Sequence, residues 1–476
     1  MKKFLALFAA LVLCICCFAG CAGNGGAVAP DLSEVDELPA FDTSKEVTIK
    51  FYHTMGQNLR DVLDFYIVEF NKLYPNIKIE HEQVGSYDDV RDQIKTEITV
   101  GGQPNIAYCY PDHVALYNLA KATQSLDTLI ASTQEITRAD GSKETLGLTD
   151  AQIADFIKGY YDEGKQFGDN KMYTIPMSKS TEVLYYNKTF FEKHNLTPPT
   201  TWDELEALCA QIKAIDPDCI PLGYDSESNW FITMCEQLGS PYTSATGDHF
   251  LFANDENYAF VKKFRDWYQK GYVTTQELSG GYTSELFTMA ETEKGNSYMS
   301  IGSSAGATHQ RPDKVDGAYP FEVGITTIPQ MNASNKKVIS QGPSLCIFKK
   351  ADPQEVLASW LFVKYLATTV EFQAEFSMAS GYVPVIKSVG ANDVYKTQFL
   401  ELADGGDFIA ALSAKICLEQ ESAYYTSPAF NGSSIARDQV GLLMQNCLSA
   451  ADGGNVDAMI KKAFADAVEE CEYQVG

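Results

Sequence analysis

The stretch from residue 172 to residue 205 reads MYTIPMSKSTEVLYYNKTFFEKHNLTPPTTWDEL, and a Gly-Asp-Asn-Lys turn at 168–171 precedes it. Near its end, Thr201 and Glu204 have the spacing of a capping box. The Thr201 hydroxyl can accept a hydrogen bond from the Glu204 backbone N–H, while the Glu204 carboxylate accepts from the backbone N–H of Thr201. We therefore expect a helix to begin at Trp202 and to end at Asp216-Pro217. The apolar stripe of this helix is Leu205, Leu208, Ile212 and Ile215.

Segments on either side of this stretch alternate between strand and helix patterns. Apolar residues have a period of two in 47–51 and helical spacing in 59–73, and the same alternation repeats at 77–79 and 90–98. Strand, helix, strand, helix is typical of α/β layering.

Later segments extend this pattern. A short apolar strand at 106–109 leads into a turn, 110–113, whose side chains we expect at the mouth of a sheet. Helices are predicted around 151–167 and from 353 to about 380, where Gly381 ends the second one. No repeat of solenoid or propeller period occurs, and the pattern predicts two α/β lobes.

Length and charge limit the function classes. The chain has 476 residues, about three times the ~150 residues typical of one domain, so we expect at least two folding units. Its 63 acidic residues outnumber 37 basic ones, for a net charge of -26. A field of that sign repels nucleic-acid phosphates and anionic lipid headgroups, so no nucleic-acid partner is expected.

The N-terminus has the features of an export signal. Two lysines after Met1 precede an uncharged apolar run at 4–18, which predicts a signal peptide at 1–20. The run ends in Phe-Ala-Gly-Cys, which resembles a bacterial lipobox with Phe18 in place of the usual Leu, so Cys21 is the expected lipidation site. A plain signal peptide or an uncleaved anchor is the alternative. Residues 21–45, rich in Gly and Pro, are expected to be a flexible tether.

This reading places the folded body outside the cytoplasm, lipid-anchored to the bacterial cell membrane, with the anchor as its only membrane contact. No later window is apolar enough to span a bilayer. Four of the 12 cysteines lie in the first 21 residues, and the other eight contain no C-x-x-C pair. Those eight are either disulfide-bonded or buried small hydrophobes.

Catalytic and metal motifs are weak. Residues 302–306, Gly-Ser-Ser-Ala-Gly, match a nucleophile elbow, but only His309 follows, too close in sequence to act as the base. We therefore interpret the segment as a polar turn. The six histidines include no pair at metal-ligand spacing, so neither a metal nor a cofactor is expected. A glycosidase with two carboxylates remains the enzyme alternative.

The opening stretch, together with three other runs, resembles family 1 extracellular solute-binding proteins, the capture subunits of ABC importers, with maltose- and glycerol-phosphate-binding proteins as relatives. The other runs are ASWLFVKYL at 358–366 leading to SGYVPV at 380–385, FNKLYPNI at 70–77, and GGQP at 101–104. They cover most of residues 46–390 in the family's order. Asn105 departs from the pattern, because an Asp commonly follows the Pro.

The resemblance implies a two-lobed periplasmic-binding-protein-like α/β fold with a hinge, a ligand cleft between the lobes, and no catalysis. By analogy, the first lobe comprises 46–175 plus 292–350, the second comprises 176–291 plus 351–476, and the hinge lies near Ile175-Pro176. The implied partners are a small solute and the transmembrane subunits of an ABC permease, and we expect a monomer.

The candidate ligand residues are those expected at strand ends and turns that face the cleft, where aromatic rings would stack on a sugar and polar groups would bind its hydroxyls. They are Tyr52, His53, Tyr110, Asp112, His113, Trp230, Ser303, Ser304, Gln341 and Tyr382. A carbohydrate is the favoured ligand. The alternatives are an anionic solute, such as a glycerol phosphate, held by Ser303, Ser304 and Arg311, and a surface adhesin without a small ligand.

Overall fold

The computed structural model describes residues 35, 37–289, 296–405, 408–451 and 454–475. The expected signal peptide, the expected lipidation site Cys21 and most of the expected tether lie outside these residues. The described end of that tether is attached to the folded body rather than free. The Val35 backbone N–H donates to Gln124 Oε1 at 3.1 Å, and the Phe41 backbone N–H donates to Gln134 Oε1 at 3.0 Å.

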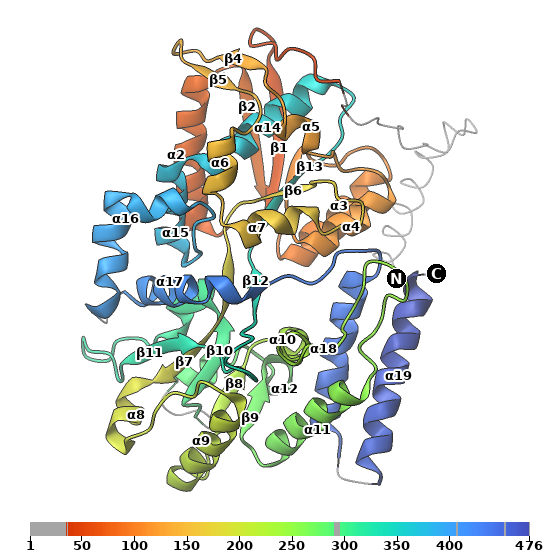
Figure 1. The fold of residues 1–476 in the computed structure, drawn as a ribbon. Helices are drawn as coiled ribbons and strands as arrows, with labels where there is room; N and C mark the ends of the chain where they lie inside the picture. Colours follow the sequence, from red (N-terminus) through yellow and green to blue (C-terminus); the bar gives the residue numbers. More distant parts are fainter. Residues whose placement is uncertain (1–34, 36, 290–295, 406–407, 452–453, 476) are drawn as a thin grey trace, which may run out of the picture.

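Two mixed β-sheets form the centres of two lobes, which lie one above the other in Figure 1. The first lobe is built on a five-stranded sheet with the order β2-β1-β3-β13-β6. Strands β1, β2 and β3 are parallel, and β13 runs antiparallel to both β3 and β6. The strands are β1 (Val47–His53), β2 (Ile77–Gln83), β3 (Ile106–Cys109), β6 (Thr174–Pro176) and β13 (Ser344–Ile347).

The second lobe is built on a seven-stranded sheet with the order β14-β12-β7-β10-β8-β9, in which β11 also pairs with β7. Its strands are β7 (Ser180–Asn187), β8 (Leu222–Tyr224), β9 (Val273–Thr275), β10 (Met299–Ser303), β11 (Val323–Thr327), β12 (Val338–Gln341) and β14 (Tyr424–Tyr425). A separate hairpin pairs β4 (Glu135–Thr137) with β5 (Lys143–Thr145).

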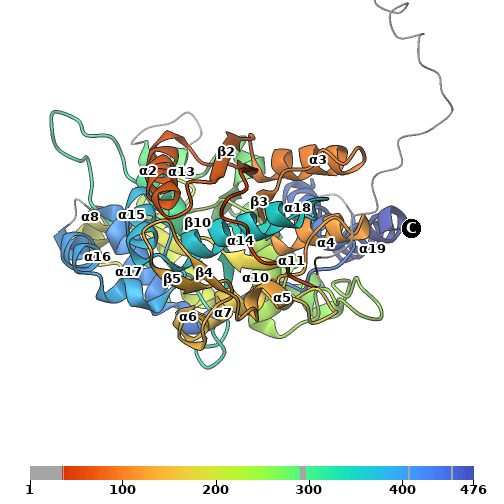
Figure 2. The ribbon, with the colours of Figure 1, turned by 90° about the horizontal axis from the view of Figure 1, so that it is seen from above.

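Helices cover both sheets, as Figures 1 and 2 show from two directions. Those of the first lobe are α2 (Gln57–Leu73), α3 (Tyr87–Ile98), α4 (Pro111–Leu119), α5 (Asp127–Ile130), α6 (Asp150–Asp155), α7 (Lys158–Asp162), α14 (Pro353–Thr368), α15 (Val370–Ser380) and α16 (Asp393–Gln398). Those of the second are α8 (Lys188–His194), α9 (Trp202–Ile215), α10 (Glu227–Leu238), α11 (Asp255–Gln269), α12 (Gln276–Ser279), α13 (Ser284–Thr288), α17 (Ile409–Glu419), α18 (Ser433–Ser449) and α19 (Val456–Val475). Among the described helices, none is long and apolar enough to cross a membrane.

The helix expected from Trp202 is α9, and its capping box is present. Its stripe is buried except for the terminal Ile215, which is 41% exposed where the helix ends. Two other helix predictions were too long. The expected helix at 353–380 is divided into α14 and α15 by the extended backbone of Thr369. The expected helix at 151–167 is interrupted at Phe156, which forms a β-bridge with Ile386.

Strand pairing corrects the predicted lobe boundaries. Strands β10, β11 and β12 were expected in the first lobe but pair within the second sheet. Helices α14 and α15 were expected in the second lobe, but α14 packs on β1 and α15 packs on α2. The reason is that β13 pairs with β3 and β6 of the first sheet, so the chain is already in the first lobe when α14 begins and stays there through α16.

Two of the passages of the chain between the lobes run along adjacent segments, 177–179 and 342–343, just beyond the expected hinge at Ile175-Pro176. A third passage joins α16 to α17. The strands that flank these crossings are partners in both sheets: β6 pairs with β13 in the first, and β7 pairs with β12 in the second. Gly342 has φ +90°, and a Cβ atom there would lie 2.6 Å from the Ser178 carbonyl oxygen. The close approach of the two segments therefore requires glycine.

A buried ion pair joins the crossing segments. Lys179 Nζ lies 2.6 Å from Glu163 Oε1, and the two side chains are 0% and 2% exposed. The same ammonium donates to the Gly342 carbonyl at 3.2 Å and to Ser344 Oγ at 3.1 Å. One lysine thus connects the first lobe with both crossing segments.

All eight cysteines from Cys109 to Cys471 are buried and free. Of the two alternatives left open by the sequence, the structure therefore supports buried thiols rather than disulfides.

We predict that Lys179→Met lowers the free energy of unfolding by about 3–5 kcal/mol, because it leaves the Glu163 carboxylate buried without its cation. Urea unfolding followed by circular dichroism measures the loss. Lys462→Met removes one partner of the exposed pair with Asp466 and is the matched control, with an expected loss below about 1 kcal/mol. Equal losses in the two variants would contradict this role of Lys179.

Candidate ligand-binding site

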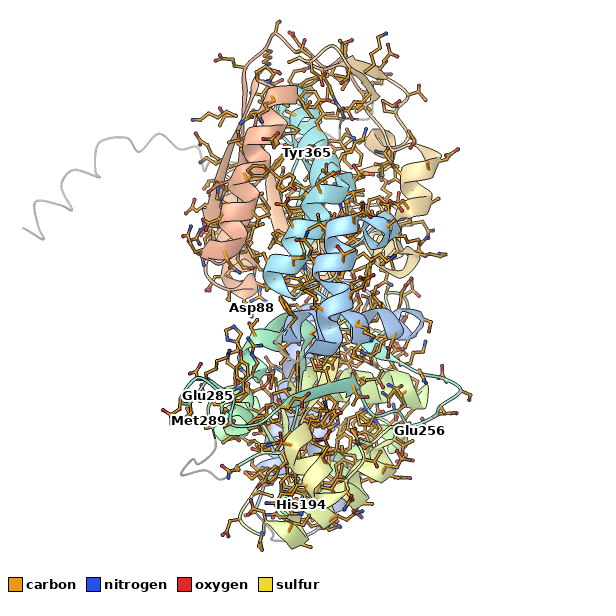
Figure 3. The ribbon with its side chains drawn as sticks, turned by 90° about the vertical axis from the view of Figure 1, so that its left-hand side faces the viewer. Asp88, His194, Glu256, Glu285, Met289 and Tyr365 are labelled. Atoms are coloured by element: carbon orange, nitrogen blue, oxygen red, sulfur yellow. The ribbon has the colours of Figure 1, made fainter. Side chains whose placement is uncertain are left out.

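A cavity of about 250 Å³ lies between the lobes and is lined by both. The first lobe contributes Tyr87, Asp88, Tyr110, Pro111, Asp112 and His113. The second contributes Ile232, Tyr242, Thr243, Ile339, Ser340, Gln341, Thr426, Ser427, Pro428, Ser433, Ser434, Arg437 and Asp438. Figure 3 shows Asp88 at the lower end of the first lobe, where that lobe faces the second.

Two helix starts hold the first-lobe wall. Ser86 caps α3 through a reciprocal capping box with Asp89, which fixes Tyr87 and Asp88 in the first turn. Strand β3 ends just before Tyr110, the N-cap of α4, whose first residue is a proline. The Tyr87 and Tyr110 rings lie 4.7 Å apart between centroids, so they form a continuous aromatic surface.

His113 lies behind this wall and is 3% exposed. Its Nδ1 has no hydrogen-bond partner among the described residues, and its Nε2 lies 3.9 Å from Asp88 Oδ1, too far for a hydrogen bond. Burial lowers the pKa of His113 below 6.5. The imidazole is therefore neutral at pH 7, with one ring nitrogen available to a hydrogen-bonding group.

The second-lobe wall is centred on the start of α18. Gly432 precedes this helix with φ +108°, and a Cβ atom there would lie 2.6 Å from Val475. Because position 432 is glycine, the backbone can turn there, and the next two residues, Ser433 and Ser434, line the cavity. Arg437, one turn further on, donates to Asn229 Oδ1.

Two hydrogen bonds join the lobes near the cavity. Arg91 Nη1 of α3 donates to Ser434 Oγ of α18 at 3.3 Å, and the Ala429 backbone N–H donates to the Gln166 carbonyl at 3.1 Å. Figures 1 and 2 agree in placing α3 and α4 over α18. These contacts hold α3 of the first lobe against α18 of the second.

The cavity wall contains more acidic than basic side chains. Asp88 is paired with Arg91 at 2.8 Å, whereas Asp112, Asp438 and the cation Arg437 face the same space. Burial, followed by the charge of Asp88, raises the pKa of Asp438. Such a wall offers both hydrogen-bond acceptors and one strong donor to a polar solute.

Residues 66–400 match the family described as bacterial extracellular solute-binding protein. The chain belongs to this family. The family is non-catalytic, so this solute-binding protein is not an enzyme, and it binds a small solute for an ABC transporter outside the cytoplasm.

Among curated relatives, the sn-glycerol-3-phosphate-binding periplasmic protein UgpB of Escherichia coli K12 is 25% identical over 380 residues, which cover 76% of this chain and 79% of the relative. UgpB of Salmonella typhimurium is 25% identical over 357 residues, covering 71% and 74% of the two chains.

Solved structures share the fold. UgpB from Mycobacterium tuberculosis in complex with glycerophosphocholine has a TM-score of 0.69 at 16% identity, covering 90% of this chain and 98% of that one. The sugar-binding protein MalE from Xanthomonas citri has a TM-score of 0.68 at 18% identity, with the same two coverages. The cyclic α-maltosyl-1,6-maltose-binding protein from Arthrobacter globiformis has a TM-score of 0.67 at 19% identity, covering 90% and 99%.

Four of the expected ligand residues line the cavity of the solute-binding protein: Tyr110, Asp112, His113 and Gln341. Tyr382 lies directly behind the wall, with its hydroxyl oxygen 3.4 Å from that of Tyr87. The other five do not line it.

Three of those five have side-chain partners elsewhere in the protein: two in the first lobe and one in the core of the second lobe. The Tyr52 hydroxyl donates to Glu97 Oε1 at 3.2 Å, and His53, fully buried, has its Nε2 2.8 Å from His81 Nδ1. Trp230 is 0% exposed because its ring is stacked between Tyr224 and Phe264, at centroid distances of 5.0 and 4.0 Å.

The serine hydroxyls of the Gly/Ser turn after β10 bind backbone groups of the protein. Ser304 Oγ accepts from the Thr181 backbone N–H at 3.1 Å, and Ser303 Oγ accepts from the Ala305 backbone N–H at 3.3 Å. Arg311 lies over the Tyr319 ring at 4.6 Å, outside the cavity. Ser303, Ser304 and Arg311 therefore do not line the interlobe cavity, and Arg437 is the cation of its wall.

Sequence reasoning missed the cavity residues of α3 and α18 and the loop that contains Tyr242 and Thr243. The Asn-Gly-Ser-Ser run at 431–434 is a turn followed by a helix start, and this signal could have pointed to α18. Nothing local distinguishes Tyr242 from the many other tyrosines.

We predict that Trp230→Ala lowers the free energy of unfolding by about 3–5 kcal/mol, because it opens a void in an aromatic core. Urea unfolding measures this loss. Solute binding, measured by calorimetry at a temperature where the variant stays folded, should change little. A variant of native stability that no longer binds solute would contradict the core assignment of Trp230.

Proposed function

We propose that the solute-binding protein captures a carbohydrate, a sugar or short oligosaccharide, between its lobes and delivers it to the transmembrane subunits of an ABC permease. The observation that carries this proposal is an interlobe cavity in which aromatic rings stand beside hydroxyl-binding groups. Tyr87 and Tyr110 of the first lobe and Tyr242 of the second border this cavity together with Asp112 and Asp438.

The chemistry of these groups suits a polyol. A tyrosine ring stacks on the apolar C–H face of a sugar, and a carboxylate accepts hydrogen bonds from two neighbouring hydroxyls. Serine and threonine hydroxyls, such as those of Ser340 and Thr426, can donate or accept as the solute requires. The cavity volume of about 250 Å³ lies below the usual ~300–1,000 Å³ of ligand pockets and favours a mono- or disaccharide.

Capture follows from the position of the cavity between the lobes. A solute that contacts both walls binds the closed arrangement more strongly than an open one, so it shifts the population toward closure. Bending at the crossing segments, 177–179 and 342–343, accounts for that motion. The permease then receives solute from the closed form.

An anionic solute such as a glycerol phosphate is the second candidate. Arg437 and the N-terminal end of α18 lie together in the wall, and a guanidinium beside helix N–H groups suits a phosphate. The curated relatives named for sn-glycerol-3-phosphate also favour it. Against it, Asp112 and Asp438 face the same space and repel an anion.

We expect glucose or maltose to raise the melting temperature of the purified protein, because saturation at about 100 times the Kd stabilises the folded state by roughly 2.7 kcal/mol. Tyr110→Ala should weaken sugar binding about tenfold or more in calorimetry, because it removes the stacking surface. Tyr473→Ala, at an 81%-exposed site on α19, is the matched control and should bind as the unmodified protein does.

Glycerol 3-phosphate in the same screen separates the two candidates. Binding of this anion alone, weakened by added salt and by Arg437→Met, would replace the carbohydrate proposal with the anionic one. Absence of binding to all three probes would contradict both.

We also propose that Cys21 carries the lipid that holds the protein at the bacterial cell membrane, and that the protein acts there as a monomer. The Phe-Ala-Gly-Cys run after an apolar segment supports this proposal. Two acyl chains on one cysteine supply the double signal that stable anchoring needs.

Cys21→Ala expressed in a bacterium that processes lipoproteins should fail to incorporate labelled palmitate. The mature protein should then leave the detergent phase in a phase-separation assay. Cys109→Ala, which removes a buried thiol far from the N-terminus, is the control and should be labelled normally. Unchanged partitioning of Cys21→Ala would indicate a plain or uncleaved signal segment instead.

A further inference from the structure

A buried carboxylate lies behind the second-lobe wall of the cavity, two hydrogen-bonded contacts away from Arg437. Glu182 of β7 is 2% exposed, and among the described residues no lysine, arginine or histidine forms an ion pair with it. An unpaired carboxylate inside a sheet costs folding free energy unless hydrogen bonds hold it. Its presence near the start of β7 therefore indicates a specific role.

Two side chains hold the carboxylate. Glu182 Oε2 accepts from the Tyr224 hydroxyl at 2.5 Å, and Oε1 accepts from Asn229 Nδ2 at 2.8 Å. Asn229, 2% exposed, lies in the first turn of α10, and its Oδ1 accepts from the Arg437 guanidinium. A continuous chain of hydrogen bonds thus runs from β7 through α10 to the cavity wall on α18.

Each link in this chain fixes the next. An ionised carboxylate only accepts hydrogen bonds, so it binds the amide nitrogen of Asn229 and turns the amide oxygen away. That oxygen is then the acceptor for Arg437. With the amide reversed, Asn229 would present N–H groups to a guanidinium that has only donors, and the contact would be lost.

We propose that Glu182 is a positioning residue that sets the orientation of the Arg437 guanidinium through Asn229 and thereby tunes solute affinity. The effect on affinity rests on the proposed binding function of the cavity, whereas the orientation of Arg437 is a property of the protein alone.

Titration of Glu182 offers a way to observe the coupling. Burial raises the pKa of Glu182 to about 7, against the lowering effects of the Tyr224 and Asn229 hydrogen bonds and of Arg437. Protonation as the pH falls through this value removes the buried negative charge and weakens the hold on Asn229.

Other titratable groups also lie near these hydrogen bonds. Around Glu182 these are Asp225, whose pKa burial raises, and the phenols of Tyr224 and Tyr425, whose pKa values burial raises well above 10. Near Arg437 they are Asp88, Asp112, Asp438, His113, Tyr110 and Tyr242. The pKa of His113 is lowered by burial, below 6.5, so its titration lies on the acidic side of that of Glu182.

Arginine side-chain NMR tests the coupling without any ligand. The chain contains six arginines, so a protein labelled with ¹⁵N-arginine gives a simple Nε–Hε spectrum, and the Arg437→Lys variant assigns the signal of interest. We expect the Arg437 signal to shift between roughly pH 5.5 and 8.5 with a midpoint near 7. Arg138 is the internal control, because its partner Glu144 has a lowered pKa and stays ionised over that range.

Two variants locate the source of the shift. Glu182→Gln keeps the shape of the side chain but cannot titrate. Asn229→Ala removes the amide that links Glu182 to Arg437. Each variant should abolish the pH response of Arg437. Glu236→Gln is the matched control, since it removes a carboxyl of α10 whose pKa is also raised by burial, and the response should persist. A wild-type signal that does not move, or a response that survives in Glu182→Gln, would overturn the proposal.

Affinity provides the second measurement, with maltose and glycerol 3-phosphate as probes. Glu182→Gln should change the Kd of the probe that binds by about fivefold or more, but should change it little in an Arg437→Met background, because the effect passes through that arginine. Equal effects in both backgrounds would show a role independent of Arg437. Failure of both probes to bind the wild type would count against the proposed function, while the arginine spectrum would still decide the orientation of Arg437.

Discussion

The buried ammonium of Lys179 holds together two adjacent segments, 177–179 and 342–343, by which the chain passes between the lobes, and the arrangement of the rest depends on it. It binds Glu163 of the first lobe and the Gly342 carbonyl of the second crossing segment. Because the flanking strands are also partners in both sheets, the crossing has one geometry. A buried pair of this kind adds little net stability but strongly penalises the loss of either partner.

The cavity is a property of the paired lobes. The first lobe supplies a wall of tyrosines and carboxylates at two helix starts, and the second supplies serine hydroxyls and Arg437. Neither wall alone encloses the cavity, so its size depends on how closely the two lobes meet. The contacts of Arg91 with Ser434 and of Ala429 with Gln166 mark where they meet. Behind the second-lobe wall, Glu182 accepts a hydrogen bond from Asn229, which in turn accepts one from Arg437 of that wall.

Local signals in the sequence predicted local structure well. The Thr201 capping box and the apolar stripe of α9 lie within a few residues of one another, and the helix formed where they indicated. The same reasoning failed at Thr369, whose extended backbone divides an apolar run that reads as one helix, and at Phe156, which forms a β-bridge with the distant Ile386. Trp230 was misread for a similar reason, because its polar neighbours in the sequence do not show that its ring faces Tyr224 and Phe264.

The amino-acid sequence by itself determined the α/β class, the two-lobed family architecture and four residues of the cavity wall. Strand ends, caps and apolar periods act over short distances, and the chain carries them wherever it folds. Only the tertiary structure decided which lobe contains each later strand, and which polar groups meet. Arg437 and Asn229 are 208 positions apart, and Arg91 and Ser434 are 343 apart. Contacts over such separations are set by how sheets and helices pack, and no local pattern encodes them.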